Sequence, residues 1–388
     1  MKRGWPIKRL GDICEIVMGQ SPSGDSYNTT GVGVPLINGP VEFSEGSFGK
    51  TIRSKFTTQP TKLCKEGDLI LCVRGSTTGR MNIAGFEACI GRGVAAIRAS
   101  QYQPWVNHFI SSKRDEIHDK GTGATFPNVS GAMIADLKLA MPPLHEQQRI
   151  VGILDETFGG IATAKANAEK NLQNAGALFE SHLQSVFSQR GEGWVDRTLD
   201  QVCIVERGSS PRPIKNYFST EPDGVNWIKI GDTEEGGKYL CSTAQKITPE
   251  GAKQSRFVRE GDFILTNSMS FGRPYIMKTS GYIHDGWFVL RLNISIDTDY
   301  FYYLLSSRFV QSQFAQLASG SVVKNISGDL VKKAVLPIPP LDQQHLIVEK
   351  LLKLSAETQR LESIYQRKLA ALDELKKSLL HQAFTGKL

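Results

Sequence analysis

Residues with the chemistry for catalysis occur throughout this chain, but not at catalytic spacings. The nearest match to a phosphate-binding loop is Gly49-Lys50-Thr51, where Ser44 occupies the position of the first glycine. No Gly-x-Gly-x-x-Gly follows a predicted strand, and no Gly-x-Ser-x-Gly turn for a nucleophile is present. The six cysteines and seven histidines form no Cys-x-x-Cys or His-x-x-x-His pair, so we expect no zinc site. These absences favour a binding protein over an enzyme.

Two polar segments have the composition of binding loops. Each follows a Glu-Gly-Asp turn, at 66–68 and at 260–262, and a short apolar run that predicts a buried strand. The segments themselves, residues 72–80 and 266–273, keep small polar residues but differ at almost every position. This pattern indicates one scaffold used twice to make different contacts.

Both segments belong to a duplication that covers the whole chain. Residues 142–151 are repeated as 339–348, and both copies begin Pro-Pro-Leu and lead into a long helical pattern. The two halves also open alike, with Trp-x-x-x-x-Leu-x-x-(Ile/Val)-Cys at 5–14 and at 194–203. Apolar runs predict strands at 93–98 and 286–291, and a helix follows each, at 105–118 and 300–317. We therefore expect two similar mixed α/β globular parts.

Two long helices are expected to position these globular parts. Proline favours the first turn of a helix, so the double prolines at 142–143 and 339–340 mark where the helices begin. About 45 residues make a rod roughly 65 Å long, which must bury its apolar stripe against another element. Antiparallel pairing of the two rods is the simplest solution, and folding of each rod back on its own domain is the alternative. The apolar stripe of the second rod is predicted at Ile347, Leu351, Leu354, Leu361, Tyr365, Leu372, Leu375 and Leu379.

These patterns divide the chain into globular parts at 1–141 and 189–338, each followed by a long helix, at 142–188 and 339–388. The expected fold class is α/β, with two similar mixed α/β domains joined by two long helices that pair as an antiparallel coiled coil about a pseudo-twofold axis. The net charge of +7 resides mainly in residues 1–141 and is compatible with a polyanionic partner. No apolar run reaches the length of a membrane span, and we expect a cytoplasmic protein without a membrane partner.

With these motifs in order, the chain resembles the specificity subunit of type I restriction-modification systems. The resemblance covers essentially all 388 residues. It rests on the repeated Trp-to-Cys openings, the two Glu-Gly-Asp turns, the two Pro-Pro-Leu-x-(Glu/Gln)-Gln helix starts, and the closing residues 383–388.

The resemblance implies a non-catalytic DNA reader. Each globular half would be a target recognition domain for one part of a split site on double-stranded DNA. The paired helices would set the spacing and dock two methyltransferase subunits, with motor-nuclease subunits joining them. S-adenosylmethionine, ATP and magnesium would then belong to the partners, and this chain would bind no cofactor or metal. Half-sites one helical turn apart are separated by about 34 Å, which a rod of this length can span.

Side-chain chemistry selects candidates for DNA contact within the polar loops. Arginine and lysine pair with guanine, asparagine and glutamine pair with adenine, and serine, threonine and lysine hold phosphates. The alternative for each candidate is a solvated loop residue. The candidates in the first half are Gln20, Ser21, Arg74, Ser76, Thr77, Thr78 and Arg80. Those in the second half are Ser209, Arg212, Lys215, Asn216, Asn267, Ser270, Arg273 and Lys324.

Partner contacts are expected near the starts of the long helices, at Gln147 and Arg149 and at Gln344 and His345. Two other classes of protein stay open at this point. One is a self-contained DNA methyltransferase or nuclease fusion. The other is a coiled-coil adaptor with no role in DNA binding.

Overall fold

A computed structural model describes residues 4–119, 128–189, 191–234, 236–267, 272–318 and 328–388. The chain forms two compact units. Unit 1 comprises Met1–Glu169 and Arg367–Leu388, and unit 2 comprises Lys170–Gln366. Each unit therefore contains one globular part and one stretch of each long helix.

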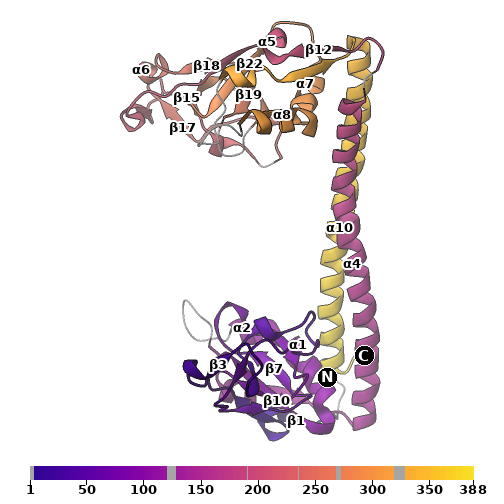
Figure 1. Ribbon diagram of the computed structural model, residues 1–388. Helices are drawn as coiled ribbons and strands as arrows, with labels where there is room; N and C mark the ends of the chain where they lie inside the picture. Colours follow the sequence, from indigo (N-terminus) through magenta and orange to yellow (C-terminus); the bar gives the residue numbers. More distant parts are fainter. Residues whose placement is uncertain (1–3, 120–127, 190, 235, 268–271, 319–327) are drawn as a thin grey trace. The chain divides into compact units, whose positions relative to one another are not determined.

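The globular part of unit 1 contains two sheets and a two-stranded ribbon (Figure 1). The first sheet is antiparallel, in the order β2-β10-β7-β8, with bounds Glu15–Met18, Val94–Arg98, Leu69–Cys72 and Met81–Ile83. The second has the order β3-β5-β4-β9-β6, with bounds Tyr27–Asn28, Phe56–Thr57, Val34–Ile37, Ala88–Ile90 and Leu63–Cys64. The ribbon pairs β1 (Ile7–Arg9) with β11 (Lys138–Ala140). The predicted apolar runs are the central strands β7 and β10, which are buried on both faces.

Unit 2 contains the same architecture with one added strand. Its first sheet has the order β13-β22-β19-β20-β16, with bounds Cys203–Arg207, Trp287–Leu292, Phe263–Thr266, Pro274–Met277 and Tyr239–Leu240. Its second has the order β14-β17-β15-β21-β18, with bounds Phe218–Ser219, Gln245–Ile247, Val225–Ile228, Gly281–Ile283 and Arg256–Val258. The ribbon pairs β12 (Val195–Thr198) with β23 (Val335–Ile338). The strand orders of the two units correspond one to one apart from β16, which confirms the predicted pair of similar mixed α/β parts.

The helix expected in each globular part is broken in two. In unit 1 it forms α1 (Gln103–Ser112) and α2 (Arg114–Asp119), and in unit 2 it forms α7 (Thr298–Ser306) and α8 (Arg308–Ala318). The break in unit 2 falls at Ser307, whose backbone is extended. Its hydroxyl donates to the carbonyl of Leu304 and accepts from the backbone of Val310. A buried serine thus ends one helix and starts the next.

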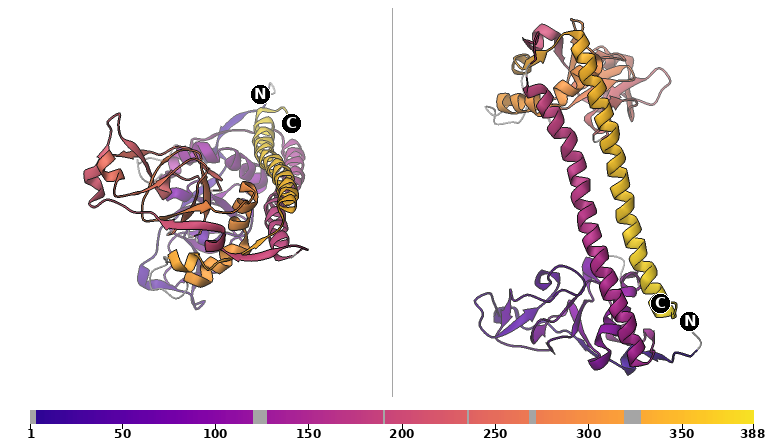
Figure 2. Two further views of the ribbon diagram at one scale, coloured as in Figure 1. Left: turned by 90° about the horizontal axis from the view of Figure 1, so that it is seen from above. Right: turned by 90° about the vertical axis from the view of Figure 1, so that its right-hand side faces the viewer.

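The long helices begin directly after the double prolines, as predicted. They are α4 (Leu144–Ser188) and α10 (Leu341–Thr385), and α4 continues without interruption through its glycines. Within each unit the two helices lie side by side and run antiparallel (Figure 2). In unit 1 Lys165 pairs with Asp373 at 2.7 Å, and Arg149 donates to the carbonyl oxygen of Leu388 at 2.9 Å. The predicted pairing of the helices is confirmed.

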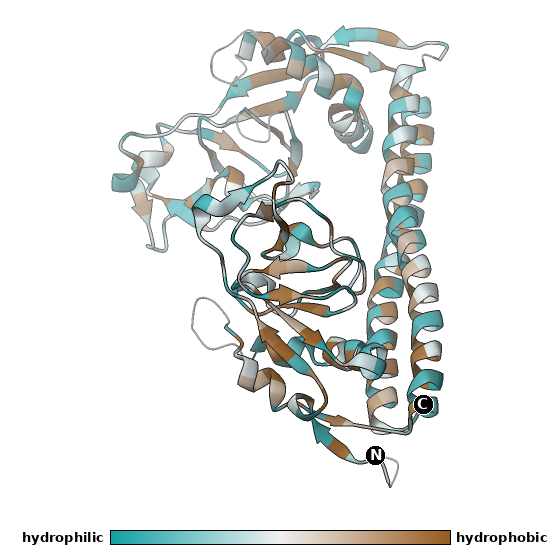
Figure 3. Ribbon diagram, turned by 60° about the horizontal axis from the view of Figure 1, so that its bottom comes forward, coloured by the Kyte–Doolittle hydropathy of each residue, from teal (hydrophilic) through white to brown (hydrophobic). Residues whose placement is uncertain are grey.

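The long helices pack against the globular parts as well as against each other. Contacts of the kind expected from folding back on a domain therefore occur in addition to the pairing of the helices. In unit 1 Ile150 and Leu154 of α4 join Leu380 and Ala383 of α10 in the core built by β7, β10 and α1. In unit 2 the core combines Leu183 and Phe187 of α4 with Val348 and Leu351 of α10. Figure 3 shows the resulting alternation of hydrophobic and hydrophilic residues along both helices. The other α-helices in the described residues are α3 (Gly131–Ala135), α5 (Leu199–Val202), α6 (Pro249–Ala252) and α9 (Gly328–Val331).

The apolar stripe of α10 differs from the prediction at two positions. Leu361 and Leu375 are 37% and 46% exposed. The buried positions on this helix instead include Val348, Leu351 and Thr358. After Thr358 the partly buried positions are Glu362, Tyr365, Leu369, Leu372 and Lys376, so the stripe keeps a period of 3.5 residues but passes one residue after Leu361 and Leu375. The sequence prediction was wrong there because it followed residue type, whereas the helix buries a threonine in the stripe.

The repeated Glu-Gly-Asp turn has a structural role. In unit 1 the buried carboxylate of Asp68 accepts from the backbone of Lys65 and receives two hydrogen bonds from Arg98, at 2.8 and 2.7 Å. In unit 2 Asp262 is placed in the same way between the backbone of Arg259 and the side chain of Arg291. Each aspartate thus joins a turn to the central strand that carries the arginine, and this explains why the motif occurs in both halves.

Candidate nucleic-acid interface

Three loops converge at one edge of each globular part, and we call this edge the three-loop site. In unit 1 the loop after β2 (residues 19–23) contacts the turn between β9 and β10 (residues 91–93), and the loop after β7 (residues 73–80) contacts the same turn. The backbone of Gly19 donates to Val94, and that of Val73 donates to Gly93. A side chain at Gly19 would lie 2.1 Å from a carbonyl oxygen of the turn, so only glycine permits this approach.

The three-loop site of unit 2 is built from the corresponding loops. The loop after β13 begins at Gly208, where a side chain would lie 2.0 Å from the carbonyl oxygen of His284. Asn267, at the end of β19, donates from its backbone to Gly286 at 2.8 Å. The turn between β21 and β22 (residues 284–286) thus joins both loops. In the sequence, the glycine turns at Gly19 and Gly208 are far from the starts of β10 and β22. The tertiary structure brings each glycine turn against the turn that precedes its strand.

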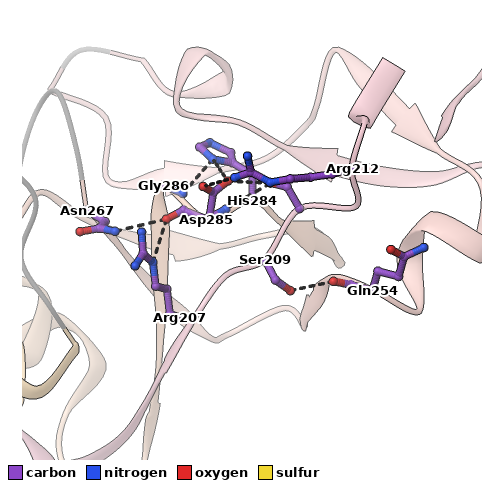
Figure 4. Close-up of polar contacts among 9 residues, drawn as sticks. Arg207, Ser209, Arg212, Gln254, Asn267, His284, Asp285 and Gly286 are labelled. Atoms are coloured by element: carbon purple, nitrogen blue, oxygen red, sulfur yellow. Dashed lines mark hydrogen bonds and ion pairs between the residues drawn. The ribbon is translucent and has the colours of Figure 1, made fainter. Parts of the chain in front are cut away.

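Side chains around Asp285 organise the site in unit 2 (Figure 4). Its carboxylate accepts from the hydroxyl of Ser210 at 2.7 Å and from Arg212 at 3.4 Å. Its backbone carbonyl accepts from Arg207 and from the side-chain amide of Asn267, both at 3.2 Å. The hydrogen bond from Ser210 is the main cause that holds the pKa of Asp285 below its ordinary value. The ionised carboxylate therefore fixes the loop that carries Arg212.

His284 in the same turn is neutral. Its Nδ1 accepts a hydrogen bond from the backbone of Gly286 at 2.9 Å, which requires an unprotonated nitrogen. Burial lowers the pKa of His284 below its ordinary value of 6.5, although the charge of Asp285 opposes the shift.

The stability of this turn is expected to fall in mild acid. Below pH 6.5 His284 becomes protonated in the unfolded chain but stays neutral in the folded chain. The free energy of unfolding therefore declines as the pH falls, until the pH reaches the lowered pKa of His284 in the folded chain. Thermal unfolding of the parent and of a His284→Gln variant from about pH 8 to about pH 5 measures this contribution. The parent should lose more stability than the variant. Equal losses in both proteins would show that His284 does not titrate differently on folding.

All four charged candidates for DNA contact in the 72–80 and 208–216 loops are exposed. They are Arg74, Arg80, Arg212 and Lys215, and Asn216, Ser76 and Gln20 are exposed as well. Ser21 accepts from the backbone of Arg92, and Ser209 donates to the carbonyl of Gln254, so both are partly engaged within the fold. Arg92 and Arg207 are exposed members of the sites that the sequence analysis missed. The sequence signals for them were the position of Arg92 directly before the predicted strand at 93–98 and that of Arg207 directly before the Gly-Ser-Ser-Pro turn at 208–211.

Other predicted contacts have structural tasks. Thr78 is 3% exposed and its hydroxyl donates to the carbonyl of Gly75, so it closes the turn in its own loop. Thr77 is partly buried. Asn267 is 1% exposed and bonds to the 284–286 turn. Arg273 lines a hollow beside α4 and α10 instead of the three-loop site. Ser270 and Lys324 lie outside the described residues.

The predicted partner-binding residues also divide by exposure. Gln147 and Gln344 are 3% and 2% exposed, and each donates its amide to the carbonyl of the first proline of its pair, Pro142 or Pro339. We therefore assign these glutamines to helix initiation, because a buried side chain cannot meet a partner. Arg149 and His345 are exposed.

The described part of the chain contains neither a cluster of three or more possible metal ligands nor a helix long and apolar enough to cross a membrane. The three-loop sites instead present arginines, lysines, amides and hydroxyls on loops held by glycine turns. Such a set can donate to base edges and phosphates, and it resembles no arrangement of nucleophile, base and oxyanion donors.

Comparison with known proteins points in the same direction. The profile described as "Type I restriction modification DNA specificity domain" matches residues 2–172 and 191–368. The putative type I restriction enzyme MjaX specificity subunit of Methanocaldococcus jannaschii is 34% identical over 38% of this chain and 35% of its own length. The type I restriction enzyme MjaVIII specificity subunit of the same organism is 23% identical over 99% of this chain and 93% of its own. A solved chain from work on complex assembly and conformational transition of the type I R-M system has the same fold, with a TM-score of 0.82, 20% identity, and coverage of 100% of this chain and 99% of its own.

Proposed function

This chain belongs to the family of type I restriction-modification DNA specificity subunits, and from that premise we propose that residues 1–141 and 189–338 are target recognition domains. Each reads one part of a bipartite site on double-stranded DNA. The specificity subunit is the non-catalytic part of the restriction enzyme complex. The observation that carries the proposal is the duplicated three-loop site, because the same backbone frame presents different side chains in the two units.

The exposed side chains of the three-loop sites are the proposed DNA contacts. Arginine at the edge of a loop can donate two hydrogen bonds to guanine, and asparagine or glutamine can do so to adenine. The proposed contacts are Gln20, Arg74, Ser76, Arg80 and Arg92 in the first domain and Arg207, Arg212, Lys215 and Asn216 in the second. Ser270 and Lys324 remain candidates from the sequence alone. Ser21, Thr78, Ser209 and Asn267 are proposed to position the loops.

The long helices are proposed to dock two methyltransferase subunits. Unit 2 leaves Leu346, Leu352, Leu361 and Ile364 of α10 between 37% and 56% exposed, and apolar side chains of this size gathered on one helix support a protein contact. Arg149 and His345 are polar candidates at the helix starts. S-adenosylmethionine, ATP and magnesium are proposed to act on the methyltransferase and motor-nuclease partners, which this chain directs to DNA.

Exchange of residues 1–141 for the matching part of a relative tests two-domain reading. The hybrid is expressed with the methyltransferase subunits, and methylated bases are then mapped across the genome. We expect one half of the methylated sequence to change while the other half and the gap stay constant, because 189–338 and the long helices are untouched. A change in both halves would contradict independent reading by two domains.

Two outcomes would favour the other classes of protein. Methyl transfer or DNA cleavage by the purified chain without partners would indicate a self-contained enzyme. Undetectable duplex binding after the methyltransferase subunits are added would indicate an adaptor without a DNA role.

A further inference from the structure

A basic hollow lies within unit 1 between the globular part and the last turns of α10. Its volume is about 600 Å³. The charged side chains that line it are mainly cationic: Lys113, Arg114, Lys138, Lys376 and Lys377, against Asp115 and Asp373. Asp373 is already paired with Lys165 at 2.7 Å, Lys113 is paired with Glu116 at 2.6 Å, and Lys377 is paired with Glu374 at 3.2 Å on the exposed face of α10. Arg114, Lys138 and Lys376 are then balanced within the hollow only by Asp115. The hollow therefore keeps an excess of positive charge.

Lys376 is a partly buried cation of the hollow. Its ammonium lies 5.1 Å from the centre of the Phe158 ring. Across the described ranges of the chain, no carboxylate forms an ion pair with it. Burial lowers the pKa of Lys376, and the charges of Lys165 and Arg114 lower it further, although Asp373 opposes the shift. An anion in the hollow would relieve the electrostatic cost of this arrangement.

The duplication supplies an internal comparison, because unit 2 has a hollow at the corresponding place. The repeat aligns Leu380 with Leu183 and Phe384 with Phe187, and it aligns Lys376 and Lys377 with Phe179 and Glu180. Phe179 and Glu180 line the hollow of unit 2, beside Tyr302 and Tyr303. The fold thus accepts an aromatic and an acidic residue where unit 1 has two lysines. The lysines are therefore not required for packing, and their charge is available to a ligand.

The basic hollow continues to the three-loop site of unit 1. Ser47 and Arg114 line it and also line a smaller adjoining hollow that contains Arg80. Arg80 is one of the proposed DNA contacts in the loop after β7. A cationic path from Lys377 and Lys376 through Arg114 to Arg80 follows the regularly spaced charges of a nucleic-acid backbone better than the compact acidic patch of a protein.

We propose that this hollow binds backbone phosphates of the DNA that flanks the first half-site, through Lys376 and Lys377, and that unit 2 lacks the equivalent contact. The inference rests on the proposed function and adds an asymmetry to it. The first recognition domain holds DNA with help from α10, whereas the second depends on its own loops. The contact is to phosphate, so it adds affinity without changing the sequence that is read.

Salt dependence of DNA binding tests the contact. The full chain is assembled with its methyltransferase subunits, and its affinity for a fluorescent random-sequence duplex is measured by anisotropy over a range of salt concentrations. Each phosphate contact contributes about 0.9 to the slope of log affinity against log salt. The Lys376→Gln/Lys377→Gln variant should therefore have a slope smaller by about 1.8. The Lys376→Phe/Lys377→Glu variant, which carries the residues of unit 2, should also bind less tightly and have a smaller slope.

A matched control removes the same charge elsewhere on α10. Lys353 and Lys368 are exposed and do not line the hollow, so Lys353→Gln/Lys368→Gln should keep the parent slope. Far-ultraviolet circular dichroism tests the folding of every variant, and gel filtration tests its assembly. An unchanged slope in both hollow variants, with normal binding by the parent, would overturn the inference alone. Loss of assembly with the methyltransferase in both hollow variants, but not in the control, would overturn it in favour of an acidic protein surface. No binding by the parent would instead contradict the proposed function.

Discussion

Replacing Asp68 by alanine is expected to lower the free energy of unfolding of unit 1 by about 3 kcal/mol, near the lower end for a buried ion pair that loses one partner. Asp68 is 2% exposed and receives two hydrogen bonds from Arg98 and one from the backbone of Lys65. Its removal leaves Arg98 paired with Glu15 at 2.6 Å, which limits the loss. Hydrogen exchange with mass spectrometry measures the protection of the backbone amides in β7 and β10 separately from that of the amides in unit 2.

The control for this prediction is Glu15→Ala. Glu15 binds the same guanidinium, but its side chain is 62% exposed, and exposed pairs contribute about 1 kcal/mol or less. Asp262→Ala should reproduce the loss in unit 2, where Asp262 bonds to Arg291 and to the backbone of Arg259. If Glu15→Ala cost as much as Asp68→Ala, the aspartate would not be the residue that joins the turn to the strand.

Phe187→Ala is expected to cost about 3–5 kcal/mol in unit 2, as for other large aromatic deletions in a core. Phe187 is completely buried near the end of α4, and its ring lies 5.6 Å from that of Tyr300. The deletion leaves a cavity where α4 joins the globular part, so α4 should lose protection together with α7. Urea unfolding of the full chain followed by hydrogen exchange measures both effects.

Phe179→Ala is the matched comparison on the same helix. Phe179 is partly buried and its ring lies 6.0 Å from that of Tyr303, so we expect a smaller loss. In unit 1 the repeat places Phe384 at the position of Phe187, in contact with Trp105 and Phe109. Phe384 is only partly buried, and Phe384→Ala should also cost less than Phe187→Ala. A larger loss from Phe179 than from Phe187 would place the main helix contact elsewhere.

The conclusions about function depend on the duplication more than on any single residue. Two copies of one scaffold show which features the fold requires, because these occur in both, as Gly19 and Gly208 do. They also show which features are free to differ, as Val73 and Asn267 do at the same backbone position of the three-loop sites. The same comparison separates Lys376 and Lys377 from the packing of α10, since unit 2 replaces both.

Several elements followed from the sequence by itself. The double prolines predicted where α4 and α10 begin, because proline restricts the backbone locally. The repeated motifs predicted two similar mixed α/β parts, and the apolar runs predicted the central strands. These features depend on near neighbours in the chain or on comparison of one half with the other, and both are visible without coordinates.

Only the tertiary structure decided which side chains are available to DNA and partners. Thr78, Asn267, Gln147 and Gln344 have the right chemistry for contact, yet each is buried by segments distant in the sequence or by the start of its own helix. Arg92 and Asp285 joined the sites only through the convergence of three separate loops. The hollow beside Lys376 likewise depends on α10 lying against α1 and α2. Burial and convergence are properties of long-range packing, and residue type alone does not encode them.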